Sequence, residues 1–163
     1  MHDLSAFPIT GKWPAQHPDR IQLYSLPTPN GVKASIMLVE TGLPYEPHLV
    51  RFDSNDQMSP EFLSLNPNNK IPAIIDPEGP GGQPLALFES GAILVYLADK
   101  SGRFMPKDPA ARYHTLQWLM WKWGAWARCL ASWVFSTNLP ARIGKTSARW
   151  AATWPSQNVC WAC

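Results

Sequence analysis

The chain has 163 residues and a formal net charge of +2, and 45% of its residues are hydrophobic. This length accommodates one ordinary domain, or one domain and part of a second, with enough apolar residues for a buried core. The small net charge excludes a large electrostatic surface for nucleic acid or membranes, and no apolar run is long enough to span a bilayer.

The N-terminal part predicts an arm, a strand and a helix. Residues 1–20 contain three prolines and show no apolar periodicity, so we predict an extended arm anchored by Phe7 and Trp13. Residues 21–24 alternate and predict the first strand, and a proline-rich turn follows. A helix is expected at about residues 32–41. Its buried face is predicted to carry three apolar side chains, those of Ile36, Met37 and Val39.

Three further strands follow. Residues 45–50 predict the second strand, and a short helix begins after Ser59, a favourable N-cap residue. The third strand is expected at residues 71–76 and the fourth at residues 84–88. A turn rich in glycine and proline joins these two strands, so they should be antiparallel.

Two long helices close the predicted pattern. One starts near Glu89 and ends near Gly102, and Pro109 opens the other. The first seven regular elements then follow the order β-α-β-α-β-β-α. Crossovers join the early strands and a hairpin joins the last two, which predicts an α/β fold with a four-stranded mixed sheet.

The stretch Pro67-Asn68-Asn69-Lys70-Ile71-Pro72 leaves two structures open. An X-Pro bond is the one peptide bond where the cis form costs little. A cis bond here would turn the backbone of Ile71 outward, so that its N–H and C=O could pair with another extended peptide. A trans proline would simply open an ordinary strand.

Three separated motifs resemble one known family. The motifs are Thr28-Pro29-Asn30-Gly31, Asn68-Asn69-Lys70-Ile71-Pro72 and Leu87-Phe88-Glu89-Ser90-Gly91. With the order of elements, they resemble the thioredoxin-like N-terminal domain of the glutathione S-transferase superfamily, and in particular its bacterial nu class. That class is associated with glutathione-dependent disulfide reduction, and the resemblance covers residues 4–122. It implies glutathione as cosubstrate, glutathione or glutathione disulfide as partner, no metal, and homodimers among intact members.

The resemblance implies catalytic roles for Thr28 and Asn30. They stand at the start of the first predicted helix, where hydroxyl and amide donors and the helix dipole favour a thiolate. Both residues also suit simple turn and cap positions. Residues 26–30 contain no cysteine, so any disulfide chemistry must come from bound glutathione, and Tyr24 is interpreted as a packing residue.

The resemblance also implies a set of glutathione-binding residues. The backbone of Ile71 would pair with the cysteinyl unit of glutathione, as in strand addition. The helix start at Ser90 would take the γ-glutamyl carboxylate, and Glu89 would take its ammonium. A common helix start and a solvated lysine are the alternatives without function. The implied binding residues are Gln57, Lys70, Ile71, Pro72, Glu89 and Ser90.

The composition changes abruptly after Lys122. No Asp or Glu follows Asp108, and the tail holds six of the nine tryptophans and all three cysteines, Cys129, Cys160 and Cys163. The family continues with a helical domain, which the tail does not resemble. We hypothesise that the loss of one base near Lys122 shifted the reading frame and truncated the chain. The predicted segments are an arm (1–20), a thioredoxin-like glutathione-binding domain (21–104), the first helix of an incomplete all-α domain (105–122) and the tail (123–163).

Two patterns in the tail carry no function. Cys160-Trp161-Ala162-Cys163 has the spacing of a redox dithiol, but such a motif belongs between a strand and a helix, and here it stands at the chain terminus. Gly144-Lys145-Thr146 lacks the earlier glycine of a phosphate loop.

Three functions remain open. They are a glutathione-dependent disulfide reductase or transferase, a truncated product that binds glutathione without turnover, and a thioredoxin-like interaction module. The first residues contain neither a basic segment nor an apolar one, so we expect no secretory signal and a cytoplasmic location.

Overall fold

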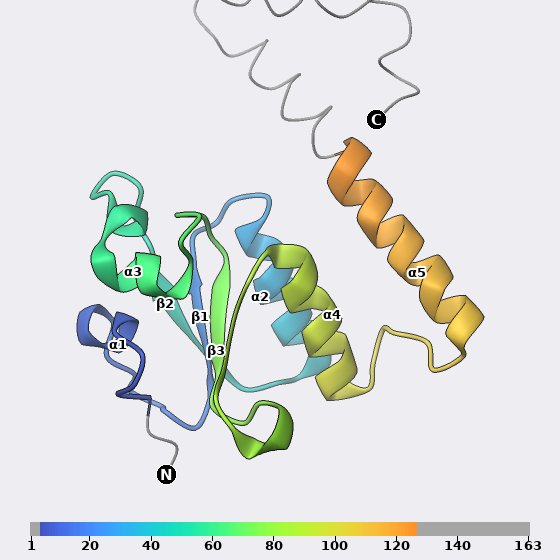
Figure 1. Ribbon diagram of the computed structural model, residues 1–163, viewed down its shortest axis with the longest axis horizontal. Coiled ribbons are helices and arrows are strands. Elements are labelled where there is room, and N and C mark those ends of the chain that lie inside the picture. Colours follow the sequence, from blue (N-terminus) through green and yellow to red (C-terminus); the bar gives the residue numbers. More distant parts are fainter. Residues whose placement is uncertain (1–3, 127–163) are drawn as a thin grey trace, which may run out of the picture. The chain divides into compact units, whose positions relative to one another are not determined.

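The structure, a computed structural model, describes residues 4–126 (Figure 1), and the chain divides after Met105 into two compact units. The first unit contains a sheet with strand order β2-β1-β3-β4. Its strands are β1 (Ile21–Ser25), β2 (Tyr45–Leu49), β3 (Ala73–Asp76) and β4 (Leu85–Phe88). β1 and β2 are parallel, whereas β3 is antiparallel to β1 and to β4. The prediction of a thioredoxin-like α/β domain with a mixed sheet is therefore confirmed.

Short and long helices alternate with these strands. In the first unit they are α1 (Ile9–Lys12), α2 (Gly31–Thr41), η1 (Asp56–Met58), α3 (Pro60–Leu65), η2 (Pro80–Gly82) and α4 (Ser90–Ser101). The second unit contains α5 (Pro109–Trp121) and the π-helical turn η3 (Lys122–Trp126). None of the helices within residues 4–126 is both long enough and apolar enough to cross a membrane.

Each face of the sheet carries its own core. Successive side chains of a strand point to opposite faces, so Leu23 enters one core and Tyr24 the other. Helices α2 and α4 cover the face of Leu23, while α1 and α3 cover the face of Tyr24 (Figure 1). The sheet is thus fixed from both sides, which holds the ends of its strands in place.

The predicted buried face of α2 was wrong for two of its three residues, whereas Met37 does pack against the core. Ile36 and Val39 are 58% and 63% exposed, and the buried residues of the helix are Gly31, Ala34 and Leu38. Positions three or four residues apart share one helix face, and the buried face combines two small residues, Gly31 and Ala34, with Leu38. Residue hydrophobicity alone pointed to the opposite side of the helix.

The arm is not simply extended. It forms α1, and Leu4 and Ile9 are buried in the core on the α1 and α3 face. The two predicted anchors, Phe7 and Trp13, do pack against this core. The indole N–H of Trp13 also donates to the backbone oxygen of Leu49, at 3.2 Å.

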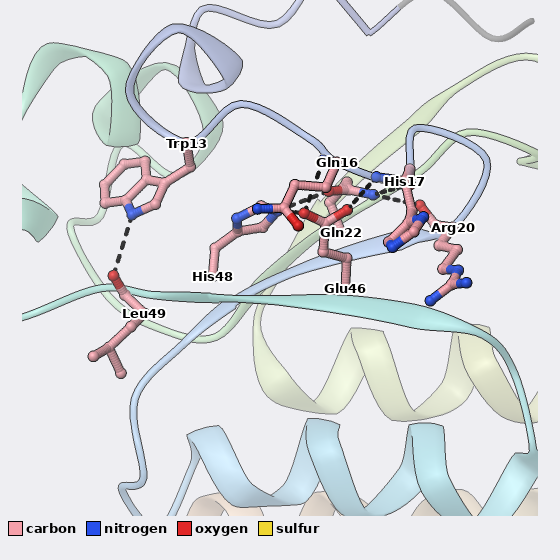
Figure 2. A network of polar contacts seen from close by, with 8 residues as sticks. All are labelled: Trp13, Gln16, His17, Arg20, Gln22, Glu46, His48 and Leu49. Carbon is pink, nitrogen blue, oxygen red and sulfur yellow. Dashed lines mark hydrogen bonds and ion pairs between the residues drawn. The ribbon is translucent and has the colours of Figure 1, made fainter.

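A carboxylate fastens the end of the arm to the edge strand β2 (Figure 2). Both oxygens of Glu46 accept backbone hydrogen bonds, from the N–H of Gln16 at 2.9 Å and of His17 at 2.7 Å. Burial acts to raise the pKa of Glu46, but these N–H groups and His48 hold the pKa below its usual value. The Glu46 carboxylate therefore remains a charged acceptor for the arm.

Gln22 and His48 continue this network beneath the arm (Figure 2). The Gln22 amide donates to the carbonyls of His17 and Arg20, at 2.9 and 2.8 Å. Its oxygen lies 2.7 Å from Nε2 of His48, and the imidazole stacks on the Tyr24 ring. Burial lowers the pKa of His48 against the opposing effect of the nearby Glu46 carboxylate. The neutral imidazole then donates its Nε2–H to Gln22.

A second polar network anchors α4 to the sheet. The buried Asp76 accepts from the Tyr96 hydroxyl at 2.6 Å and pairs with the Lys100 ammonium at 2.7 Å. Burial and the Asp76 carboxylate both raise the pKa of Tyr96, so its hydroxyl remains a donor. Gly102 ends α4 in the left-handed conformation, as predicted.

Helix α5 begins where Pro109 predicts a helix. The Asp108 side chain caps it by accepting from the N–H of Ala111 at 2.8 Å. None of the side chains of α5 is buried, and Trp118 is 63% exposed. Most of the predicted tail and all three cysteines lie in residues 127–163, outside the described residues.

Candidate functional site

The sheet topology gathers the predicted site residues at one end. Tyr24, Ala73 and Phe88 form one row across β1, β3 and β4. At this row β1 and β4 finish and β3 starts, and the parallel strand β2 finishes beside β1. We call this the site end of the sheet. The segments that leave or enter the strands there carry all eight predicted residues, Thr28, Asn30, Gln57, Lys70, Ile71, Pro72, Glu89 and Ser90.

The start of α4 is an uncapped helix end at the site end of the sheet. Its N-cap residue, Glu89, has φ 71° and ψ 112°, and its side chain makes no capping hydrogen bond. Glu89 is exposed, whereas Ser90 is buried. The first N–H groups of a helix carry partial positive charge and attract anions. The positive φ of Glu89 is a backbone strain, and such strain is typical of functional sites. Here it places an acidic residue beside a helix end that attracts anions.

The backbone at Ile71 lies next to this helix start. Ala73 pairs with Phe88, so Ile71 and Ser90 each lie two residues beyond the last pair of the ladder. The Ile71–Pro72 peptide bond is cis, and the Ile71 side chain is buried in the core. The predicted strand at residues 71–76 is therefore too long, because pairing starts only at Ala73. Pro72 has no N–H to give to the ladder.

The buried side chain of Asn66 shapes the turn that leads to Ile71, a role that the motifs did not reveal. Its amide donates to the backbone oxygen of Lys70 at 2.5 Å, and its oxygen accepts from the N–H of Asn68 at 3.0 Å. Asn69 takes the left-handed conformation in this turn. The signal was present in the sequence, because Asn followed by Pro is typical of such Asx turns.

The start of α2 holds Thr28 and Asn30. The Thr28 hydroxyl accepts from the N–H of Gly31, the first residue of α2, at 3.1 Å. The Asn30 oxygen accepts from Nζ of Lys33 at 2.8 Å. Both side chains retain donor hydrogens for a ligand. The Leu26 oxygen would lie 2.1 Å from a Cβ atom at residue 31, so only glycine fits this close approach.

Gln57 lies on η1, which the arm supports. The Lys12 ammonium lies 2.8 Å from a carboxylate oxygen of Asp56, and this hydrogen bond chiefly holds the pKa of Asp56 below its usual value. The side-chain oxygen of Gln57 is buried and accepts no hydrogen bond from residues 4–126. Lys70 is exposed. Tyr24 is fully buried in the core on the α1 and α3 face, as a packing residue would be, and burial raises its pKa. Its hydroxyl makes no hydrogen bond within residues 4–126.

An apolar pocket adjoins the α2 start. It has a volume of about 310 Å³ and lies between α2 and the edge strand β2. Its lining includes Leu26, Pro27, Val32, Tyr45, Pro47 and Leu49. No group of three His, Cys, Asp or Glu side chains that could hold a metal ion occurs in the described part of the chain.

Comparison with known proteins points to one family. Residues 20–99 match the model of the glutathione S-transferase N-terminal domain. The chain is 51% identical over 105 residues to the disulfide-bond oxidoreductase YfcG of Escherichia coli. The match covers 64% of this chain and 49% of YfcG. It is 48% identical over 116 residues to the disulfide-bond oxidoreductase YghU of the same organism. That match covers 68% of this chain and 39% of YghU.

Solved structures that resemble this chain are also glutathione transferases. A glutathione transferase from Burkholderia graminis, with two glutathione molecules bound per subunit, is 75% identical, with a TM-score of 0.76. The match covers 77% of this chain and 52% of that one. A glutathione transferase from Pseudomonas putida, with one glutathione disulfide bound per subunit, is 72% identical, with a TM-score of 0.74. This match covers 76% of this chain and 54% of that one. The chain thus spans about half the length of the relatives that it matches.

Proposed function

Because this chain belongs to the glutathione S-transferase family, with residues 20–99 as its N-terminal domain, we propose that the site end of the sheet binds glutathione or glutathione disulfide. The observation that carries this proposal is the start of α4. There an exposed acid at positive φ stands beside uncapped backbone N–H groups. This pair of groups suits a ligand end that offers both an anion and a cation.

The γ-glutamyl end of glutathione offers both charges. Its α-carboxylate suits the N–H groups and the hydroxyl at Ser90, because a helix start favours negative charge. Its α-ammonium suits the Glu89 carboxylate, since a charge-assisted hydrogen bond is stronger than a neutral one. These two contacts would fix the orientation of the tripeptide.

The rest of the tripeptide then runs along the free backbone before β3. Its cysteinyl unit would pair with the N–H and C=O of Ile71, which lie outside the ladder of the sheet. Pro72 would shape this edge, and Gln57 and Lys70 would reach the ligand from the side. The thiol would lie at the start of α2, where Thr28 and Asn30 retain donors.

This arrangement supports glutathione-dependent disulfide reduction or thiol transfer. A bound glutathione thiolate attacks one sulfur of a disulfide, and the other sulfur leaves as a thiolate that takes a proton. A second glutathione then attacks the mixed disulfide, which yields glutathione disulfide and the second free thiol. The loop at residues 26–30 contains no cysteine, so both attacking thiols would belong to glutathione.

A second candidate function is binding without turnover. It is favoured by one observation: residues 123–163 contain no Asp or Glu and do not resemble the helical domain of the family. We also propose that residues 21–104 form the glutathione-binding domain, that residues 105–122 begin a helical domain, and that a frameshift produced residues 123–163. Sequencing the gene tests the last point, because an uninterrupted frame encoding this tail in close relatives would refute it. We further propose a cytoplasmic location, and homodimers for intact family members.

Calorimetric titration of the full chain with glutathione tests the binding proposal. Glu89→Gln should weaken binding by about tenfold, because it removes a charged partner of the ammonium. Glu40→Gln, an exposed position near the far end of α2, is the matched control and should bind as the wild type does. A folded wild-type chain that does not bind glutathione would refute the proposal.

A disulfide-reduction assay with glutathione and a small disulfide then separates the two candidates. Binding with turnover supports the reductase or transferase. Binding without turnover supports the second candidate. A folded chain that neither binds nor turns over would leave the thioredoxin-like interaction module.

A further inference from the structure

Lys33 is joined to one of the proposed catalytic residues. It lies in the first turn of α2, and its Nζ donates to Oδ1 of Asn30 at 2.8 Å. An ammonium has three donors and no acceptor, so it takes the amide oxygen as its partner. The nitrogen of the Asn30 amide is therefore turned away from Lys33.

The Thr28 side chain, like that of Asn30, uses its oxygen as an acceptor for a donor in α2. Its hydroxyl accepts from the N–H of Gly31 at 3.1 Å, and its own hydrogen remains available for donation. The side-chain oxygens of Thr28 and Asn30 thus accept hydrogen bonds from residues of α2, and their donor hydrogens remain available to a ligand. Hydrogen bonds donated to the ionised form of a group lower its pKa. This arrangement would favour a ligand thiolate over the neutral thiol.

We propose that Lys33 is a positioning residue for the glutathione thiolate, acting through Asn30. Its ammonium holds the Asn30 oxygen, so that the amide N–H₂ group faces the ligand sulfur. Without Lys33 the amide is free to turn its oxygen toward the sulfur, where a lone pair would face the thiolate and destabilise it. The inference rests on the proposed function, because it requires glutathione to bind with its sulfur at the start of α2.

The test follows the ionisation of bound glutathione in the full chain, by the ultraviolet absorbance of its thiolate as a function of pH. Lys33→Met should raise the apparent pKa of the bound thiol by about 0.5, the size expected for a partly exposed charged contact. Lys33→Arg keeps a donor for the Asn30 oxygen and should restore the wild-type value. Glu40→Gln changes a charge at an exposed position near the far end of the same helix and should change nothing.

A double-mutant cycle separates positioning from a simple charge effect. In the Asn30→Ala background, Lys33→Met should produce no further change in the apparent pKa, because the amide through which Lys33 acts is gone. A change of full size in that background would overturn the proposal and leave Lys33 as a nearby charge. An unchanged pKa in the single Lys33→Met variant, with glutathione bound, would also overturn it. Failure of the wild type to bind glutathione would instead refute the proposed function and, with it, this inference.

Discussion

Helices α4 and α5 have nearly the same length, 12 and 13 residues, but they are stabilised in opposite ways. Helix α5 has favourable local signals, with Asp108 as a bonded N-cap and Pro109 at the first helical position, yet it buries no side chain. Helix α4 starts at a strained, uncapped residue, yet five of its residues are buried. Its stability therefore comes from packing against the sheet and α2.

This difference explains where a site can form. A helix that is fixed by tertiary packing can leave the N–H groups of its first turn unpaired, because their capping is not needed to hold the helix. At α4 these groups and Glu89 become available to a ligand. At α5 one of the same groups, the N–H of Ala111, is already satisfied by Asp108.

The largest expected effect comes from truncating one side chain on each helix. Leu97→Ala in α4 removes a fully buried side chain and should lower the free energy of unfolding by about 2–5 kcal/mol. Trp118→Ala in α5 removes an exposed side chain and should change it by about 0.5 kcal/mol or less. Urea denaturation of both variants checks the comparison, and equal losses would contradict it.

A pair of helical glycines tests how tightly the packed domain holds the α2 start. Gly31→Ala would place a Cβ atom 2.1 Å from the Leu26 oxygen, so the loop with Thr28 and Asn30 must shift. We expect a loss of about 1–3 kcal/mol and weaker glutathione binding. Gly11→Ala in α1 meets no atom within 4 Å and should be neutral or slightly stabilising. Thermal unfolding and calorimetry of both variants measure these effects.

The strained start of α4 predicts that one substitution can raise the stability of the domain while it weakens glutathione binding. Glu89→Gly removes the side chain from a backbone with φ 71° and should stabilise the domain by about 1 kcal/mol. The same change should weaken glutathione binding, because it removes the partner of the ammonium. Glu89→Gln keeps the backbone strain and should weaken binding without the gain in stability. A Glu89→Gly variant that is both less stable and fully binding would contradict this account.

The smallest expected effect concerns pH. Burial lowers the pKa of His48 from its ordinary 6.5, so between that value and the folded pKa the unfolded chain binds more protons. Stability should therefore fall as the pH drops through this window. His48→Gln should remove this fall, whereas His114→Gln, at an exposed position on α5, should not. Thermal midpoints between pH 7 and pH 5 measure the difference.

The lowered pKa of Glu46 adds a separate loss at lower pH. Its ordinary value is 4.5, and a carboxyl group with a depressed folded pKa contributes stability that is lost only as the pH falls below the ordinary value. The two losses can therefore be distinguished. A single loss centred below pH 4.5 in the wild type would show that His48 does not contribute.

The order of the elements could be predicted because turn residues and periodicity are local signals. Gly42 and Gly102 end helices in the left-handed conformation, and Ser59 caps α3. The inner face of α2 could not be predicted from hydrophobicity, because small residues such as Ala34 pack there while Ile36 faces solvent. Packing against α4, rather than residue type, decided that face.

The candidate site was predictable where a motif marked it and hidden where it depends on the fold. Glu89 and Ile71 were found through the motifs that contain them. The contact of Glu46 with the arm joins residues 29 positions apart and appears only in three dimensions. The contact of Asn66 with Lys70 is local, and the Asn-Pro pair was a signal for it. The Lys33 contact with Asn30 is local, but the resemblance gave it no role.

The most direct test of the central claim is a titration of the isotopically labelled chain with glutathione, followed by the amide signals in NMR spectra. The account predicts that the signals of Ile71, Ser90 and Gly91 move together with one dissociation constant, because one ligand contacts both the backbone before β3 and the start of α4. Signals near the far end of α2, such as that of Glu40, should remain in place. Movement of only one of these two groups, or of neither, would contradict the account.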